Sequence, residues 1–240
     1  MARRPATIYG LRAALAVGVH RPQAIQRVVY DAARRDALRS LLKVTASQRR
    51  PYREGTADDL AALAGTVHHE GVVVVADPLP LLALPALLAR LPSNGLVVAL
   101  DGVDNPHNVG AVLRSAAWFG VDAVLVGEGG GDTLNPATVR VAQGGAEVVP
   151  VAAAHLPRAL EALRARGYAV LGADQNATID ALTDPPTRPV CLVLGGEAEG
   201  LSEDVRAACD VWVRVPGTGA VESLNVGVAA AILMARAFRA

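Results

Sequence analysis

The sequence has few aromatic residues, few cysteines and no long hydrophobic run. Aromatic side chains make up only 3% of the residues although 52% are hydrophobic, so the core must be built from Ala, Val and Leu. The two cysteines, Cys191 and Cys209, are too few for a disulfide framework and lack the spacing of metal ligands. These thiols suit a reducing cytoplasm, and no metal site is predicted.

No apolar run approaches the ~18 residues that a membrane-spanning helix needs. The first 20 residues faintly resemble a secretion signal, but the apolar stretch between Arg12 and His20 is short and no cleavage site follows it. The sequence therefore predicts a cytoplasmic protein.

The net charge is zero, but charge is divided unevenly along the chain. Residues 1–53 carry 12 basic side chains against the two acids Asp31 and Asp36, and the remaining residues carry 11 basic and 21 acidic side chains. Such asymmetry favours binding of nucleic acid or another acidic surface by the basic part. The alternative is an arginine-rich face that is only solvated.

A stretch with four prolines, residues 76–95, separates the two regions of different charge. It predicts a linker, with or without a short helix. We expect a first domain over residues 1–77, a linker over 78–94 and a second domain over 95–240.

The first region alternates helix and strand patterns, which predicts a small α/β or α/β/α sandwich. Thr56 is the expected N-cap of one helix, with Asp59 at its third position. The expected helices span residues 10–18, 35–46 and 56–65, and the expected strands span 27–31 and 71–77.

The second region contains continuous apolar runs, which are typical of a parallel sheet covered on both faces. The expected strands span residues 95–101, 122–127, 146–151, 168–173, 189–195 and 211–216. Because ligands bind beyond the carboxyl ends of such strands, the residues that follow each strand are the candidates for a site.

The stretch "NPHNVGAVLRSA" after the first of these strands predicts an apolar helix from Val109 to Phe119, with Asn108 as N-cap. Its only charged residue is Arg114, which needs a partner if it is buried. Arg114 either extends to water or pairs with a carboxylate for stability, or it binds phosphate near the helix start.

Two further stretches carry polar residues that a simple connection does not need. In residues 192–204, Gly195 and Gly196 permit either close approach of a ligand or a sharp turn, and Ser202 is the expected cap of the next helix. Glu197 is a candidate partner of Arg114. In residues 213–238, two polar residues, Ser223 and Asn225, enter an otherwise apolar helix, and one of them is its expected N-cap.

A dinucleotide site is a weaker alternative. The glycine-rich residues 127–132 fail the G-x-G-x-x-G pattern at Asp132, and no acidic residue ends the next strand.

Together and in this order, the three stretches resemble the SpoU/TrmH family of RNA ribose 2′-O-methyltransferases. The family's motif N-x-G-x-x-x-R matches Asn108, Gly110 and Arg114, L-V-x-G-x-E-x-x-G matches residues 192–200, and I-P-x-x-G-x-V-x-S-L-N-V-x-V-A matches residues 215–229. The N-terminal part is more weakly similar to the L30e-like domain of the subgroup that methylates a guanosine of large-subunit ribosomal RNA.

The resemblance implies an α/β fold in two parts. An L30e-like α/β/α domain would precede a SPOUT domain, a parallel sheet whose last part forms a deep trefoil knot. The knot would bind S-adenosylmethionine, and the active site would lie at a homodimer interface. The substrate would be RNA, with ribosomal RNA favoured and transfer RNA open.

The motifs also imply roles for single residues. The implied catalytic set is Asn108, Arg114, Glu197, Ser223 and Asn225. The cofactor would be held by Ala173, Leu194, Gly195, Gly196, Val215 and Leu224. Because a guanidinium stays protonated in proteins, we expect Arg114 to bind the RNA phosphate and to stabilise a developing alkoxide. Glu197 would hold Arg114 in place.

Three positions depart from the family pattern. Glu70 stands where Gln is usual, Gly217 where Met is usual and Gly227 where Ser is usual. These departures bear on the choice of RNA more than on the reaction. The alternatives are a transfer-RNA ribose methyltransferase and a catalytically silent RNA-binding protein of the same fold.

Overall fold

The computed structural model describes residues 4–128, 133–196 and 199–238. The chain divides into two compact units, one of Met1–Pro80 with Leu134–Val148 and one of Leu81–Thr133 with Val149–Ala240. Leu134–Val148 thus packs with the first unit although it lies within the second region of the sequence. The division of the chain at residues 77 and 95 stays a prediction.

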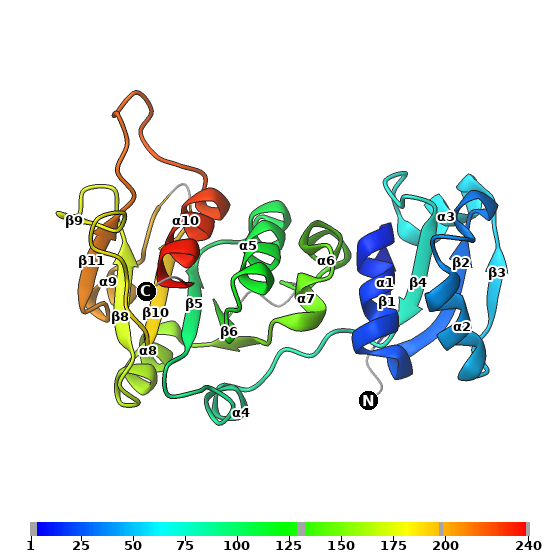
Figure 1. The fold of residues 1–240 in the computed structure, drawn as a ribbon, viewed down its shortest axis with the longest axis horizontal. Helices are drawn as coiled ribbons and strands as arrows, with labels where there is room; N and C mark the ends of the chain where they lie inside the picture. The colour runs from blue at the N-terminus through cyan, green and yellow to red at the C-terminus, as the bar shows by residue number, and fades with distance from the viewer. Residues whose placement is uncertain (1–3, 129–132, 197–198, 239–240) are drawn as a thin grey trace. The chain divides into compact units, whose positions relative to one another are not determined.

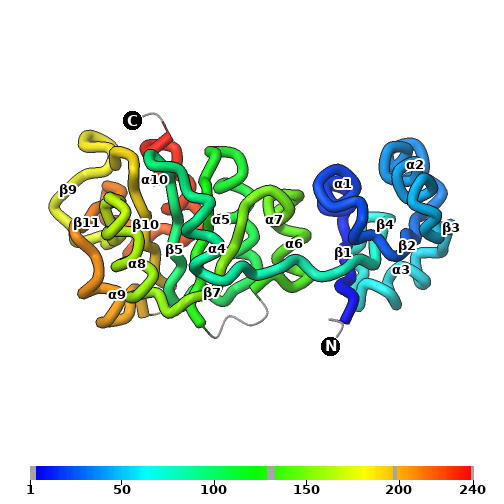
Figure 2. The backbone as a smooth tube through the Cα atoms, turned by 90° about the horizontal axis from the view of Figure 1, so that it is seen from below, coloured from blue at the N-terminus to red at the C-terminus, as the bar shows by residue number. Residues whose placement is uncertain are grey.

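The first unit is a four-stranded sheet with helices on both faces (Figure 1). The strand order is β1 (Ala6–Tyr9), β4 (Val72–Ala76), β2 (Ile25–Tyr30) and β3 (Tyr52–Glu54). Helices α1 (Leu11–His20) and α2 (Arg39–Ser47) lie on one face, and α3 (Ala57–Ala64) lies on the other (Figure 2). These layers confirm the α/β/α sandwich, in which β1 and β3 were not expected.

Residues of β4 show why the sheet needs both layers. Val73 packs with Tyr9 and with Leu60 of α3. Because alternate residues of a strand point to opposite faces, Val72 and Val74 face α1 and α2. All three valines are fully buried, as a strand covered on both faces requires.

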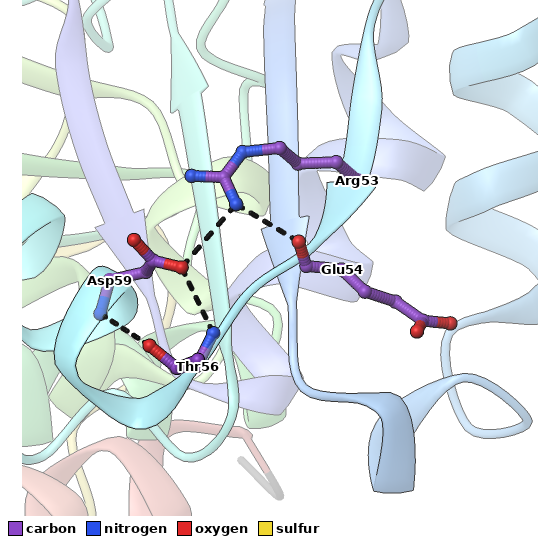
Figure 3. A network of polar contacts seen from close by, with 4 residues as sticks. All are labelled: Arg53, Glu54, Thr56 and Asp59. Atoms are coloured by element: carbon purple, nitrogen blue, oxygen red, sulfur yellow. Dashed lines mark hydrogen bonds and ion pairs between the residues drawn. The ribbon is translucent and has the colours of Figure 1, made fainter.

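A capping box starts α3, as Thr56 and Asp59 predicted. The Thr56 hydroxyl accepts the Asp59 N–H at 3.2 Å, and the Asp59 carboxylate accepts the Thr56 N–H at 3.1 Å (Figure 3). The Arg53 guanidinium lies 3.4 Å from the same carboxylate. These contacts, the Thr56 N–H bond first, hold the pKa of Asp59 below its usual range.

The second unit contains a seven-stranded sheet in which every strand pair that the structure describes is parallel. The strand order is β7 (Val151–Ala154), β6 (Ala123–Gly127), β5 (Leu96–Asp101), β10 (Val190–Gly195), β8 (Ala169–Ala173), β11 (Val211–Arg214) and β9 (Ile179–Asp180). Five of the six expected strands are confirmed to within about two residues.

Helices cover both faces of this sheet. Val97 and Val193 pack with Leu160 of α8 (Leu156–Arg164), beside α4 (Leu84–Leu88) and α9 (Glu203–Ala207). Leu192 and Leu194 alternate to the opposite face. There α10 (Val226–Phe238) packs on β10 and on α5 (Pro106–Trp118).

The strand expected over residues 146–151 is wrong. Residues Gly145–Val148 form helix α7, which follows α6 (Pro136–Ala142), and the strand begins only at Val151. Glu147 lies inside the expected strand, and its side chain is buried. Its carboxylate accepts two hydrogen bonds from the Arg21 guanidinium, at 2.7 and 3.0 Å. A short apolar run does not distinguish a strand from a buried helix by its pattern alone.

Helix α5 begins three residues earlier than expected. Asn105, whose side chain accepts the His107 N–H at 2.9 Å, is the N-cap, and Pro106 occupies the first helical position. Asn108 is therefore a buried residue inside the first turn and not the cap.

Candidate active site

The carboxyl ends of four neighbouring strands form the edge on which the predicted site residues fall. Gly195, the last residue of β10, is paired in register with Asp101, the last residue of β5. Ala173, the last residue of β8, is paired with Val213 of β11. Val215 follows β11 directly. This edge is where an open parallel sheet binds its ligands.

Asp101 holds the loop that follows β10. Its Oδ2 accepts two hydrogen bonds from Ser202, from the N–H at 2.7 Å and from the hydroxyl at 2.8 Å. Ser202 occupies the N-cap position of α9, but its side chain makes no capping bond, because the hydroxyl is used on Asp101. Ser202 therefore joins β5 to α9, and its expected position as the N-cap of α9 is confirmed, although its hydroxyl bonds to Asp101 and not to the helix.

Gly195 and Gly196 are needed for the packing of the chain on itself. A Cβ on Gly195 would collide with the backbone of Gly200, and a Cβ on Gly196 would collide with the carbonyl of Gly102. The Gly196 N–H also donates to the Asp101 carbonyl at 2.9 Å. The close approach that the structure shows at these glycines is that of the chain itself, and the approach of a ligand stays a prediction.

Two predicted catalytic residues from distant motifs meet in the structure. The Asn225 side-chain N–H₂ donates to the Asn108 side-chain oxygen at 2.9 Å, which links the start of α10 to the first turn of α5. The Asn225 oxygen accepts the N–H groups of Gly227 at 2.9 Å and Val228 at 3.3 Å. Asn225, and not Ser223, is thus the cap of α10, and Ser223 is an exposed residue of the preceding loop.

Gly227, a departure from the family pattern, lies at this contact. A Cβ at position 227 would stand 3.2 Å from Ala111 Cβ and 3.2 Å from the Asn225 side-chain oxygen. Glycine therefore lets α10 approach α5 closely. The departure at Glu70 also has a partner, because its carboxylate lies 3.2 Å from the guanidinium of Arg140 and accepts the Leu11 N–H at 3.0 Å.

Arg114 differs from expectation in its surroundings. It is exposed, and it lies eight residues after the first residue of α5, beyond the influence of the helix start. Among the described residues, no carboxylate forms an ion pair with it. Arg114 is thus not buried, and its side chain extends to water, one of the alternatives that the sequence left open. Its proposed partner, Glu197, lies outside the described residues, as does Asp132 of the glycine-rich stretch.

A groove of about 450 Å³ runs along α5 and α10. Ala111 and Ser115 line it from α5, and Asn225, Val228 and Ile232 line it from the other side. Large apolar side chains are exposed on the same two helices, with Trp118 83% exposed and Phe238 56% exposed.

The sequence patterns missed a polar cluster beside Ala173. Asp174 accepts from the Arg206 guanidinium at 2.7 Å, and that guanidinium stacks on the Trp212 ring at 4.4 Å. The Arg206 bond, followed by the Asn176 N–H bond, holds the pKa of Asp174 below its usual range. The signal was a polar residue directly after a strand, in a stretch that carries no motif.

Burial raises the pKa of both thiols, that of Cys209 to about 11, so neither is a reactive thiolate. The described residues contain no group of three or more His, Cys, Asp or Glu that could hold a metal ion. No helix in the described part of the chain is long and apolar enough to cross a membrane.

The motif-bearing region matches the model of a known family, described as the SpoU rRNA Methylase family, over residues 95–235. The chain belongs to this family. A second family model, described as RNA 2′-O ribose methyltransferase substrate binding, matches residues 7–82.

Curated relatives match the SpoU chain over nearly its whole length. The 23S rRNA (guanosine-2′-O-)-methyltransferase RlmB of Pseudomonas putida is 36% identical over 237 residues, which cover 97% of this chain and 95% of the relative. The RlmB of a Burkholderia species is 38% identical over 221 residues, which cover 91% and 90%.

A solved structure is similar in fold and sequence. The SpoU methyltransferase AviRb from Streptomyces viridochromogenes, in complex with the cofactor AdoMet, superimposes with a TM-score of 0.80 at 26% identity. The match covers 97% of this chain and 89% of that chain. Membership confirms the family resemblance, the α/β fold class and the activity that it implies, an RNA 2′-O-methyltransferase that uses S-adenosylmethionine. The knot stays a prediction.

Proposed function

We propose that this SpoU methyltransferase methylates the ribose 2′-hydroxyl of a guanosine in large-subunit ribosomal RNA. The observation that carries the proposal is full-length similarity to methyltransferases of 23S rRNA guanosine, which spans the first unit as well as the second. A match confined to the catalytic region would have left the RNA open. The similarity also favours the cytoplasm, where ribosomal RNA is found and where thiols stay reduced.

The residues at the carboxyl edge fit S-adenosylmethionine. Ala173 and Gly195 end neighbouring strands with minimal side chains, which leaves their partly exposed backbone within reach of a ligand. Leu194 supplies a buried apolar floor, and Val215 and Leu224 flank the loop after β11. With Gly196, these are the residues that we assign to cofactor binding. When bound, the cofactor supplies a methyl group on a positively charged sulfur.

The other site residues are assigned to position the ribose and to stabilise the negative charge that develops during methyl transfer. In our proposal Asn108 and Asn225, joined by their hydrogen bond, orient the target nucleotide from the start of both helices. Ser223 orients the ribose from the exposed loop. Arg114 grips the phosphate beside the target ribose and stabilises negative charge as it develops on the 2′-oxygen. Glu197 is assigned to hold Arg114.

We further propose that a second copy of the chain covers the groove on α5 and α10. This would bury the exposed Trp118 and Phe238 and place the exposed Arg114 beside an interface. Desolvation there would strengthen the interaction between Arg114 and a phosphate. A homodimer thus supplies the enclosure that Arg114 lacks in the single chain.

Methyl transfer from labelled S-adenosylmethionine to unmodified large-subunit ribosomal RNA tests the proposal. The expected result is label at the 2′-oxygen of one guanosine. Label in transfer RNA alone would support the tRNA alternative. RNA binding without transfer, together with no cofactor binding, would support the catalytically silent alternative, and either outcome would contradict the proposal.

A further inference from the structure

A small cleft lies on the first unit between helix α2 and the edge strand β3. These two elements lie side by side in Figure 1 and in Figure 2. Its volume is about 250 Å³, below the ~300–1,000 Å³ of pockets for drug-sized ligands. Three basic side chains, Arg35, Arg39 and Lys43, line it together with one acid, Asp36, and with Tyr52. The cleft has room for one small planar group beside several positive charges.

The sequence builds this cleft from helix spacing and an edge strand. Arg39 and Lys43 are four residues apart on α2 and therefore project from the same face. Leu41 and Thr45 of the same helix are buried against the sheet. Tyr52 is 45% exposed and lies on β3, an edge strand with a neighbour on one side only.

The positive charges of the cleft are available to an anion. Arg35 pairs with Glu54 at 3.0 Å and Arg39 pairs with Asp36 at 3.5 Å, and all four side chains are largely exposed. Exposed ion pairs contribute little free energy, so a phosphate can replace either carboxylate at small cost. Lys43 forms no ion pair with any residue that the structure describes.

The turn that leads from α2 to Tyr52 adds two more basic residues. The Arg50 N–H donates to the Thr45 carbonyl at 3.1 Å and the Arg49 N–H donates to the Ala46 carbonyl at 2.9 Å, the pattern that closes a helix through a left-handed residue. That residue is Arg49, at φ 55°, where glycine would adopt the conformation without steric cost. Arg49 and Arg50 are both exposed and come shortly before Tyr52 in the sequence.

We propose that this cleft binds a single unstacked nucleotide of the RNA substrate, with the base on the Tyr52 ring and the adjoining phosphates on Arg39 and Lys43. The inference rests on the proposed function, because RNA must be the substrate. An exposed ring among cations suits a base that is splayed out of a helix, since single-stranded RNA is recognised by stacking together with phosphate contacts. A paired base in a duplex does not present its face to a side chain.

Two readouts on the full-length protein test the inference. The first is the affinity for fluorescein-labelled dodecauridylate, and the second is the KM for unmodified large-subunit ribosomal RNA in the methyl-transfer assay. Tyr52→Ala should lower the affinity for the oligonucleotide and raise the KM for the ribosomal RNA, each by about tenfold, because stacking of one base is lost. The kcat should stay unchanged. Tyr52→Phe keeps the ring and should behave like the wild type.

Charge variants supply the matched comparison. Lys43→Glu should weaken RNA binding, because one phosphate contact is lost. The slope of the logarithm of the dissociation constant against the logarithm of the salt concentration should fall by about one. Arg166→Glu makes a similar charge change at an exposed residue between α8 and β8, at the amino end of the second unit's sheet, and should have no effect. Unchanged melting temperatures show that the variants are folded.

The outcomes separate this inference from the proposed function. Wild-type methylation with unaltered binding by Tyr52→Ala and Lys43→Glu would overturn the inference alone. Equal weakening by Tyr52→Ala and Tyr52→Phe would also overturn it, since the ring would then not be the contact. Displacement of the labelled oligonucleotide by polyglutamate as effectively, per negative charge, as by unlabelled RNA would show that the cleft recognises charge only. This result would contradict the inference. Absence of wild-type methylation would overturn the proposed function, and the inference with it.

Discussion

Arg114 is exposed on α5, and its proposed role depends on its fork of donors as well as on its charge. A lysine retains the charge but not the paired, planar contact with phosphate. Replacement of Arg114 by lysine should therefore impair the two proposed functions of this residue, binding of the phosphate and stabilisation of the alkoxide. It should leave cofactor binding unchanged.

Arg114→Lys should lower kcat by about 100-fold and leave the dissociation constant of S-adenosylmethionine unchanged, because one preorganised donor to the developing charge is lost. Single-turnover methylation and a cofactor titration measure the two quantities. Arg158→Lys, at an exposed residue of α8, is the control. Near-normal turnover by Arg114→Lys would contradict the proposed role.

Asp174 makes acid stability a second test at a single side chain. Its pKa is lowered in the folded chain, mainly by Arg206, so its ionised form stabilises the fold above the unfolded pKa of about 4. That stabilisation is lost as the pH falls through the folded pKa. Asp174→Asn should therefore reduce the free energy of unfolding at pH 7 and flatten its fall between pH 5 and pH 3, as urea titrations measure. The same acid dependence in both proteins would show that Asp174 is not the group responsible.

Single residues also show where sequence patterns were insufficient. The three motifs identified Asn108 and Asn225, but only the fold shows that the two side chains bond to each other across 117 positions of sequence. The pattern placed the cap at Asn108, since it favoured the residue before the apolar run, whereas Asn105 and Pro106 start the helix. The apolar neighbours of Arg114 in the sequence left its burial open, because exposure depends on which face of α5 the sheet covers.

Among the elements, continuous apolar runs predicted five strands of the parallel sheet because these strands are buried on both faces. The short strands β1, β3 and β9 lacked such runs. The strand predicted over residues 146–151 was wrong for a different reason. The buried ion pair of Glu147 with Arg21 links positions far apart in the sequence. Ion pairs of this kind leave no periodic signal.

The close approach of β10 to its following loop gives a prediction about that element. Gly195→Ala places a methyl group against the backbone of Gly200, which cannot move aside as a flexible side chain can. The variant should lose about 1–3 kcal/mol of unfolding free energy and weaken cofactor binding, because the strand end and loop must separate. Gly127→Ala, at the carboxyl end of β6 where a Cβ meets nothing within 4 Å, is the matched control. Equal stability and cofactor affinity of the two variants would contradict this account of Gly195.

Assembly of two copies is tested on the groove of α5 and α10. Glutamate in place of Val228, which is 48% exposed and lines the groove, would place a charge within the proposed interface. Val228→Glu should convert a dimer to a monomer in sedimentation velocity and lower methyl transfer with it. Val67→Glu, at an exposed apolar residue of the first unit, is the control. A wild-type chain that sediments as a monomer would contradict the dimer directly.

At the scale of the whole molecule, residues 7–82 match a substrate-binding family model, residues 95–235 match the SpoU model, and the proposed substrate of the pair is ribosomal RNA. The measurement that tests this most directly is a map of 2′-O-methyl sites in total RNA from cells with and without the gene. The account predicts that one guanosine of large-subunit ribosomal RNA loses its methyl group without the gene and regains it on complementation. Loss of a methyl group only from transfer RNA, or no change at any ribose, would contradict it.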